Sequence, residues 1–287
     1  MPKIVAEIGC NHKGDFAIAE EMISVAAKFC KVDVVKFQKR NIATLLSARE
    51  RSEPHPNPAH AYGETYGEHR RALEFDIGQH MRLQDICAAH GVGYSTSVWD
   101  VVSAREIIAL RPQLIKVPSA QNLNWAMLDV LSCEFGGEVH ISLGMTTRAE
   151  EEKIVKLFQS NGRGRDVVLY ACTSGYPVSF DDICLFEVPR LRSAFDGSVK
   201  AIGFSGHHLG IAADVGALAL GAAWFERHFT LDRTWKGTDH AASLEPDGLR
   251  KLCRDLRAVS RAMTFKATDI LEVERPQRQK LKRIAGG

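Results

Sequence analysis

The sequence has no long apolar run and no long basic run, and these two absences exclude two classes of protein. Nowhere do roughly 18 apolar residues follow one another, the length that indicates a membrane-spanning helix. The 37 Lys and Arg residues nearly balance 35 Asp and Glu residues, and the net charge of +2 leaves no basic track for nucleic acid or an anionic membrane. We therefore expect no nucleic-acid or membrane partner, and a small soluble substrate instead.

The sequence also lacks the marks of a secreted protein. Its N-terminus, "MPKIVAEIGCNH", has neither the basic flank nor the apolar stretch of a signal peptide. The seven cysteines are an odd number without a C-x-x-C spacing, so they fit neither a disulfide framework nor a zinc ribbon. We predict a cytoplasmic protein whose cysteines are small buried thiols.

Short β-rich runs alternate with amphipathic segments of helical length, which is typical of a parallel sheet with crossover helices. The predicted strands are residues 3–8, 32–37, 93–97, 114–117, 138–142, 167–171, 201–205 and 224–228. Helices are predicted at 15–29, 77–90, 101–110, 124–133 and 148–161. Eight β/α units in one chain of 287 residues predict an α/β fold, the (β/α)8 TIM barrel.

Two segments depart from the repeating units. Residues 41–75 are long and polar for a connection, so we expect a functional loop after the second strand. The end of the sequence, "ERPQRQKLKRIAGG", is charged and poor in apolar spacing. We assign residues 1–270 to the barrel domain and 271–287 to a charged C-terminal tail or truncated linker.

Every predicted strand ends in, or is followed by, a polar side chain. The active site of a TIM barrel lies at the carboxyl ends of its strands, where the βα-loops gather. One such residue could be a solvated strand end, but eight strands with polar ends predict a site. The residues are Glu7, Lys36, Gln38, Thr96, Lys116, Ser119, Ser142, Ser174, Tyr176, Ser205, His207 and His228.

The segment "GFSGHHLG" contains two adjacent histidines. Because side chains alternate along a strand, Ser205 and His207 share one face and His208 points away. The same alternation pairs Glu226 with His228 on the next strand of a closed barrel. Two converging imidazoles suit a divalent ion such as Mn²⁺, Co²⁺, Zn²⁺ or Fe²⁺ that polarises a carbonyl, the alternative being structural hydrogen bonds.

Two lysines indicate an anionic substrate. Lys36 and Lys116 accompany hydroxyl groups at the strand ends, and together these groups suit a phosphate and a carboxylate. A Schiff-base lysine, as in an aldolase, is the alternative. The hydroxyls belong to Thr96, Ser119, Ser142 and Ser205.

Several motifs of the sequence resemble those of a known family, the N-acetylneuraminate (sialic acid) synthases, which are phosphoenolpyruvate-condensing TIM barrels. The resemblance runs in family order from residue 4 to about residue 250. The motifs are "AEIGCNHKGD", "DVVKFQ", "TYGEHRRALEF", "YSTSVWD", "IKVPSAQNLN", "ISLGMTT", "ACTSGYPV", "GFSGHHLGIAADVGALALGA" and "ERHFTLDRTWKGTDHAASLEPDGL".

The resemblance implies a reaction and its residues. Phosphoenolpyruvate would condense with an open-chain amino sugar or related aldehyde, giving a 2-keto-3-deoxy sugar acid and phosphate. A divalent metal, Mn²⁺ first, with Mg²⁺ or Co²⁺ as alternatives, would bind His207 and His228. Phosphoenolpyruvate would contact Thr96, Lys116, Ser119, Ser142, Ser174 and Ser205. The sugar would contact Gln38, Tyr176 and the predicted catalytic residues Glu7, Lys36 and Asp239.

The sequence departs from the family pattern in three places. Gln121 stands where many members have Glu, and Gly206 stands where many have Asp. Most members continue into a small antifreeze-like (SAF) domain that this sequence does not include. We therefore expect a sugar without an acetamido group, or a contact supplied by the chain's own basic tail or by a separate SAF-domain protein. The resemblance also implies a homo-oligomer, a dimer or a tetramer.

Two alternative functions remain open. The first is a phosphoenolpyruvate-dependent synthase for a different, phosphorylated aldose. The second is a catalytically silent barrel that binds a sugar.

Overall fold

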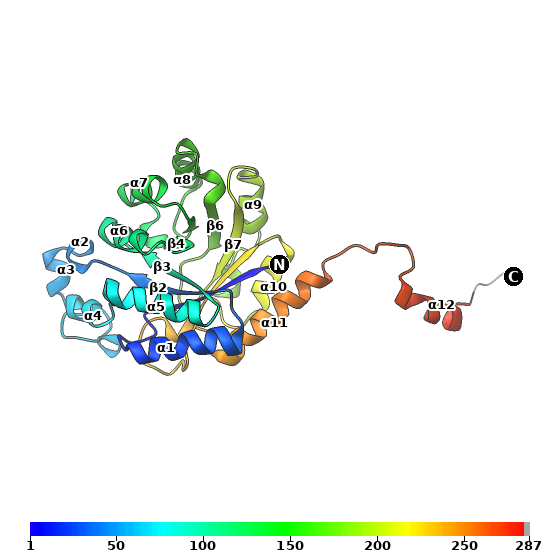
Figure 1. Cartoon of the computed structure of the whole chain (residues 1–287), viewed down its shortest axis with the longest axis horizontal. Coiled ribbons are helices and arrows are strands. Elements are labelled where there is room, and N and C mark those ends of the chain that lie inside the picture. Colours follow the sequence, from blue (N-terminus) through cyan, green and yellow to red (C-terminus); the bar gives the residue numbers. More distant parts are fainter. Residues whose placement is uncertain (284–287) are drawn as a thin grey trace.

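The computed structural model describes residues 1–283 and folds them into a closed barrel of eight parallel strands in the order β1 to β8 (Figure 1). Each strand pairs with its neighbours in sequence, and β1 closes the barrel against β8. The fold predicted from the sequence is therefore confirmed, and each predicted strand boundary lies within about two residues of the observed one. The strands are β1 Lys3–Gly9, β2 Val34–Lys39, β3 Gly93–Val98, β4 Leu114–Val117, β5 Glu138–Ser142, β6 Val167–Cys172, β7 Ala201–Gly206 and β8 Trp224–His228.

Helices surround the barrel, and several begin at side chains that satisfy free backbone N–H groups. Asp76 and Thr147 form capping boxes with the Gln or Glu three residues later, which fixes the starts of α5 and α8. The predicted helix at 15–29 is an α-helix that continues into a π-helical turn, Val25–Cys30, and ends at Lys31 with φ 63°. The helices are α1 Phe16–Ser24, α2 Ile42–Leu45, α3 Ala48–Ser52, α4 Tyr66–Ala72, α5 Ile77–Ala89, α6 Val101–Ala109, α7 Trp125–Glu134, α8 Arg148–Ser160, α9 Glu187–Ala194, α10 Ala212–Ala219, α11 Pro246–Ala262 and α12 Arg275–Leu281.

Apolar packing fills two regions. The larger core lies between the barrel and its helices and includes Ile4, Phe37, Ile115 and Phe225. Inside the barrel, a small layer of Val5, Val34 and Leu114 packs with Trp224. Above this layer the interior becomes polar, because Glu7 and Lys36 occupy the next inward positions of β1 and β2. The barrel interior is therefore apolar at its base, and a charged cavity lies above this apolar layer.

Residues 41–75 connect β2 to α5, as predicted, and contain the short helices α2, α3 and α4. Two contacts bind this segment to the loop after β8. Tyr62 Oη donates to the carbonyl of Lys236, and the backbone N–H of Gly237 donates to His60 Nδ1 at 3.3 Å. The segment therefore forms one wall of the barrel mouth.

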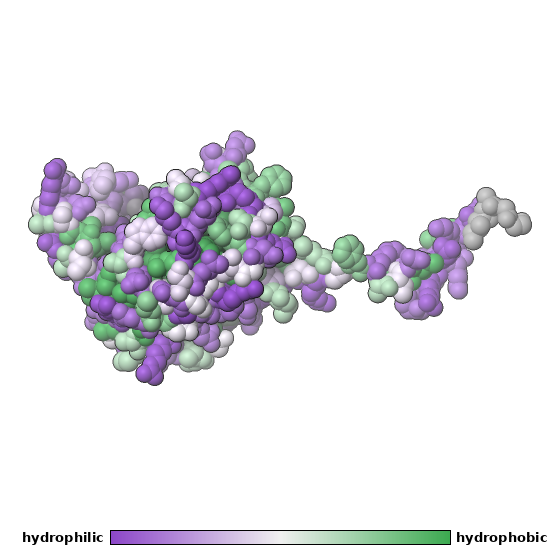
Figure 2. Space-filling view, turned by 90° about the horizontal axis from the view of Figure 1, so that it is seen from above, coloured by the Kyte–Doolittle hydropathy of each residue, from purple (hydrophilic) through white to green (hydrophobic). Residues whose placement is uncertain are grey.

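The C-terminal segment extends away from the barrel (Figure 1). Helix α12 is mainly hydrophilic at the surface seen in Figure 2 and has no buried residue. This part of the predicted tail is thus a short exposed helix, and residues 284–287 lie outside the described residues. None of the helices in residues 1–283 has the length and apolar composition needed to span a membrane.

Candidate active site

A cavity of about 370 Å³ opens at the carboxyl ends of the strands. Its volume suits a small-molecule site, where a few polar groups converge. Eleven of the twelve predicted strand-end residues line it, together with Asp239 from the loop after β8. These residues are Glu7, Lys36, Gln38, Lys116, Ser119, Ser142, Ser174, Tyr176, Ser205, His207 and His228.

Thr96 is the predicted residue that does not face the cavity. It lies in register with Phe37, on the face of the sheet that packs against the helices, and it is fully buried there. Its neighbour Ser97 lines the cavity and accepts a hydrogen bond from Lys36 Nζ at 2.7 Å. The assignment of Thr96 as a ligand of phosphoenolpyruvate was therefore wrong by one position, which reverses the face in a strand.

Four buried charges form the floor of the cavity. Lys36 Nζ makes an ion pair with Glu7 Oε2 and lies 3.8 Å from Glu226 Oε1. Lys116 Nζ lies 2.7 Å from Glu226 Oε2, and Ser205 Oγ donates to Glu226 Oε1 at 3.3 Å. Two ammonium groups and two carboxylates thus neutralise one another before any ligand binds.

Burial and charge act against each other on the ionisable groups of this floor. Burial would raise the pKa of Glu226, but Lys116 and Lys36 outweigh it and hold the pKa well below its usual range. Burial lowers the pKa of Lys116, although Glu226 acts to raise it. Glu226 is therefore a carboxylate whose charge helps to keep the proton on Lys116.

The two predicted metal-binding histidines converge in the mouth of the cavity. The ring centroids of His207 and His228 lie 5.5 Å apart, and the ring of Tyr176 lies 4.4 Å from that of His207. His208 faces outward, as the alternation predicts, and its Nε2 lies 3.2 Å from both Arg227 Nη1 and Asp214 Oδ2.

The chemistry of these two imidazoles fits a metal ligand pair. His207 Nδ1 lies 3.1 Å from the carbonyl oxygen of Thr173 and donates to it, which leaves Nε2 with a free lone pair. Burial lowers the pKa of His207 to about 3, so the ring is neutral. His228 Nδ1 is buried and forms no hydrogen bond. Among residues 1–283, no group of three or more His, Cys, Asp or Glu side chains is arranged to hold a metal, so a metal would take its other ligands from water or substrate.

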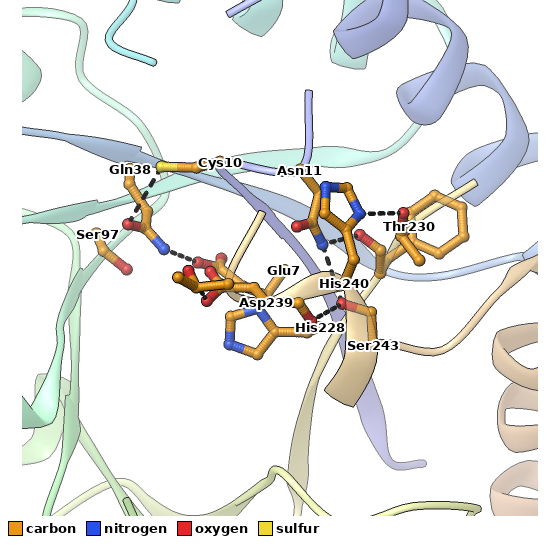
Figure 3. Close-up of polar contacts among 12 residues, drawn as sticks. Glu7, Cys10, Asn11, Gln38, Ser97, His228, Thr230, Asp239, His240 and Ser243 are labelled. Atoms are coloured by element: carbon orange, nitrogen blue, oxygen red, sulfur yellow. Dashed lines mark hydrogen bonds and ion pairs between the residues drawn. The ribbon is translucent and has the colours of Figure 1, made fainter. Parts of the chain in front are cut away.

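Carboxylate and amide groups form the wall next to His228 (Figure 3). Gln38 Nε2 donates to Glu7 Oε1 at 2.8 Å, and Asp239 Oδ2 lies 3.9 Å from His228 Nδ1. Burial acts to raise the pKa of Asp239, but His228, a hydrogen bond from Thr238 and more distant arginines together lower it. Asp239 is therefore an ionised carboxylate at neutral pH.

Gln121 and Gly206, the two residues that depart from the family pattern, have different surroundings. Gln121 is partly buried, accepts a hydrogen bond from Asn124 Nδ2 at 3.1 Å and does not line the cavity. At Gly206, a Cβ would lie 2.9 Å from His208 Cε1 and 2.9 Å from Phe204 Cε1. The space that a side chain at position 206 would need is thus occupied by His208.

Several residues of the cavity were not predicted as site residues. Alternation along β8 had placed Glu226 on the face of His228 without assigning it a role, and alternation along β3 could have identified Ser97, which lies in register with Lys116. His69 and Arg70, on α4, had no such signal in the sequence. No periodic pattern predicts which residues of a long connection reach the mouth of a barrel. The others include Cys10, Asn11, Arg40, Tyr62, Trp99 and Cys172.

Comparisons with known proteins identify the family of this chain. The NeuB family model matches residues 22–268. N-acetylneuraminate-9-phosphate synthase of Homo sapiens is 37% identical over 281 residues, which cover 97% of this chain and 76% of that protein. N,N'-diacetyllegionaminic acid synthase of Campylobacter jejuni is 32% identical over 261 residues, 91% of this chain and 77% of that protein.

A solved structure has the same fold over nearly the whole chain. The N-acetylneuraminic acid (sialic acid) synthetase of Leptospira borgpetersenii serovar Hardjo-bovis superimposes with a TM-score of 0.81 at 26% identity, covering 99% of this chain and 93% of that one. The chain therefore belongs to the NeuB family and is an enzyme of the N-acetylneuraminate synthase type, as its motifs predict.

Proposed function

We propose that this protein condenses phosphoenolpyruvate with an open-chain amino sugar aldehyde, giving a 2-keto-3-deoxy sugar acid of the nonulosonate type and inorganic phosphate. One observation carries the proposal. The cavity combines two imidazoles at the ends of adjacent strands with two buried lysines and a set of hydroxyl groups. Relatives named as synthases of N-acetylneuraminate 9-phosphate and diacetyllegionaminic acid support the same reaction class.

Phosphoenolpyruvate would bind at the side of the cavity formed by β4 to β7. Lys116 supplies the cation, and Ser119 and Ser174 supply hydroxyl donors. Gly144 makes the close approach of these hydroxyls possible, because a Cβ there would lie 2.7 Å from Ser119 Oγ and closer still to Ser174 Oγ. Ser142 and Ser205 line the same side.

The aldehyde would bind between the histidine pair and Lys36, with Gln38, Tyr176 and Asp239 against the sugar hydroxyls. A divalent metal held by His207 and His228 would act as a Lewis acid on the aldehyde oxygen. Lys36 is held by Glu7 and Ser97, so its ammonium group is oriented toward the same region before the sugar binds.

Every bond and proton of the proposed reaction can be accounted for. C3 of phosphoenolpyruvate forms a bond to the aldehyde carbon, whose oxygen becomes a hydroxyl by taking a proton. Water adds to C2, and the resulting hemiketal loses phosphate to give the 2-keto group. Glu7 and Asp239 are the carboxylates of the cavity positioned to transfer these protons.

The test is a phosphate-release assay with phosphoenolpyruvate, a series of Mn²⁺, Mg²⁺ and Co²⁺, and a panel of aldoses, with mass spectrometry of the product. We expect one phosphate per sugar acid and severe loss of phosphoenolpyruvate binding in Lys116→Met. Lys200→Met is the matched control, because Lys200 pairs with Glu138 at the opposite end of the barrel. Absence of phosphate release with every metal and aldose would contradict the proposal.

A further inference from the structure

Lys116, the lysine proposed to bind phosphoenolpyruvate, has an aromatic neighbour as well as a carboxylate. Its Nζ atom lies 2.7 Å from Glu226 Oε2 and 4.0 Å from the centre of the Tyr170 ring. A cation over the face of an aromatic ring, within about 6 Å of its centre, is attracted by the electron-rich π surface. Both side chains are buried, so water screens this attraction little and it is stronger than at a surface.

Tyr170 lies inside the barrel because of its place on β6. It is in register with Ser142 of β5, which lines the cavity, and with Gly203 of β7. A Cβ at Gly203 would lie 2.6 Å from Tyr170 Cε1, so this glycine provides the space that the ring occupies. Tyr170 itself does not line the cavity, so it acts on a ligand only through Lys116.

A chain of hydrogen bonds fixes the orientation of the Tyr170 ring. His140 Nε2 lies 3.4 Å from Glu138 Oε2, and His140 Nδ1 lies 2.8 Å from Tyr170 Oη. Burial lowers the pKa of His140, so its ring is neutral and carries one N–H. The hydrogen bond from His140 lowers the pKa of Glu138 to about 2, so this carboxylate only accepts. His140 therefore donates from Nε2 and accepts at Nδ1, and the hydroxyl group of Tyr170 donates to it.

The aromatic face stabilises the ammonium group of Lys116 without cancelling its charge. A carboxylate such as Glu226 stabilises this group but also neutralises it, which weakens the attraction for an incoming anion. The ring of Tyr170 carries no net charge, so it leaves that attraction intact. The ammonium group has three N–H bonds, of which Glu226 accepts one among the contacts within residues 1–283. Donors therefore remain for a ligand in the cavity.

We propose that Tyr170 is a positioning residue for phosphoenolpyruvate, and that its π face holds the charged ammonium group of Lys116 in place at the cavity. The inference rests on the proposed function, because it concerns the lysine that would contact phosphoenolpyruvate. Space filling is the alternative role for a buried tyrosine. A ring that only fills space would be insensitive to the electron density of its π face, and this difference can be measured.

The experiment compares Tyr170→Phe with variants that carry difluoro- or trifluorophenylalanine at the same position. Fluorine withdraws electrons from the π face and changes the shape of the ring little, and no member of this series has the hydroxyl group that binds His140. Calorimetry gives the dissociation constant of phosphoenolpyruvate, and steady-state kinetics give both KM values. We expect the dissociation constant to rise stepwise with fluorination, by roughly 5- to 30-fold over the series, as loss of a desolvated cation–π contact predicts. The KM for the sugar should stay constant.

Tyr94 provides the matched control. It is buried, and its Oη lies 2.8 Å from His80 Nδ1, the same distance that separates Tyr170 from His140. Tyr94 packs in the core between the barrel and its helices, and none of the lysines and arginines in residues 1–283 lies over its ring. The same series at position 94 should leave the dissociation constant of phosphoenolpyruvate unchanged.

A constant dissociation constant along the series at position 170 would overturn the inference, and so would an equal rise in the KM for the sugar, which indicates general distortion of the cavity. Both results leave the condensation reaction intact, because the wild type would still release phosphate. If loss of the hydroxyl group prevents folding, fluorotyrosines at position 170 keep that group and give the same test. Failure of the proposed function would instead appear in the wild type, as neither phosphate release nor phosphoenolpyruvate binding, and would remove this inference with it.

Discussion

Replacement of Glu226 by Gln tests whether the buried charges of the cavity floor depend on one carboxylate. Glu226 contacts Lys116 at 2.7 Å and Lys36 at 3.8 Å. Lys36 keeps a second carboxylate, Glu7, whereas Glu226 is the only carboxylate in residues 1–283 within 4.0 Å of Lys116. The substitution therefore leaves Lys116 as a buried ammonium group without a carboxylate partner.

The distances give the size of the effect. Because Coulomb energy falls as the inverse of distance, the contact to Lys36 is about 0.7 times as strong as that to Lys116. Removing one partner of a buried ion pair costs about 3–5 kcal/mol. Gln keeps an oxygen that can accept from Lys116, so we expect a loss of about 3 kcal/mol in the free energy of unfolding, or roughly 6–12 °C in melting temperature.

The substitution should also move the pH dependence of activity. Burial already lowers the pKa of Lys116, and loss of Glu226 removes the charge that opposes this shift. Phosphoenolpyruvate binding requires the charged form, so activity is lost as the pH rises through this pKa. The basic limb of the kcat/KM profile for phosphoenolpyruvate should therefore move to lower pH in Glu226→Gln.

The assay measures thermal unfolding and the pH profile of the same preparations. Glu134→Gln is the control, because Glu134 pairs with Arg105 on the exposed surface and should change neither quantity. If Glu226→Gln kept both the melting temperature and the basic limb of the wild type, Lys116 would not depend on Glu226, and the argument would be wrong.

Three other predictions use different parts of the structure. His207→Ala and His228→Ala should each lose bound metal, measured by elemental analysis, whereas His208→Ala should keep it because His208 faces away from the cavity; equal metal content in all three would contradict the ligand pair. Gln121→Glu should leave kcat/KM unchanged, because this side chain lies outside the cavity, and complete loss of activity would show a direct contact with substrate. Burial lowers the pKa of both His12 and His80 to about 3, so only the unfolded chain takes up these protons as the pH falls below 6.5. Stability should then fall by up to about 5 kcal/mol between pH 6.5 and 4.5, with a shallower slope in His80→Gln, and a flat urea-unfolding profile over this range would contradict it.

The sequence predicted the barrel because each strand is a short local pattern. The inward layer of Glu7, Lys36 and Lys116 follows from alternation along strands that begin and end near the predicted positions. The error at Thr96 has the same origin, since a strand position read one residue away points to the opposite face. Local sequence patterns therefore predicted the location of the site. They did not predict which face of the strand Thr96 occupies, because that depends on the exact register.

Contacts between distant segments could not be predicted in this way. Arg70 reaches the cavity because residues 41–75 fold into short helices and bind the loop after β8 through Tyr62 and His60. The partners of Tyr62 and His60 lie 174 and 177 positions further along the sequence, respectively. No periodic pattern in the sequence predicts contacts over such separations. The position of Arg70 in the cavity is therefore visible only in the folded chain.

Strand β8 shows how the two faces of one strand fix the site together. Glu226 and His228 face the cavity, while Arg227 between them faces the helices and makes an ion pair with the buried Asp214. Arg227 also donates to the carbonyl oxygens of His208 and Gly210, which belong to the loop that carries His207. A buried ion pair contributes little net stability compared with apolar packing, so the effect of this one is mainly on geometry. Because Arg227 binds β8 to the loop after β7, the relative position of His207 and His228 is set from outside the cavity, before any ligand enters.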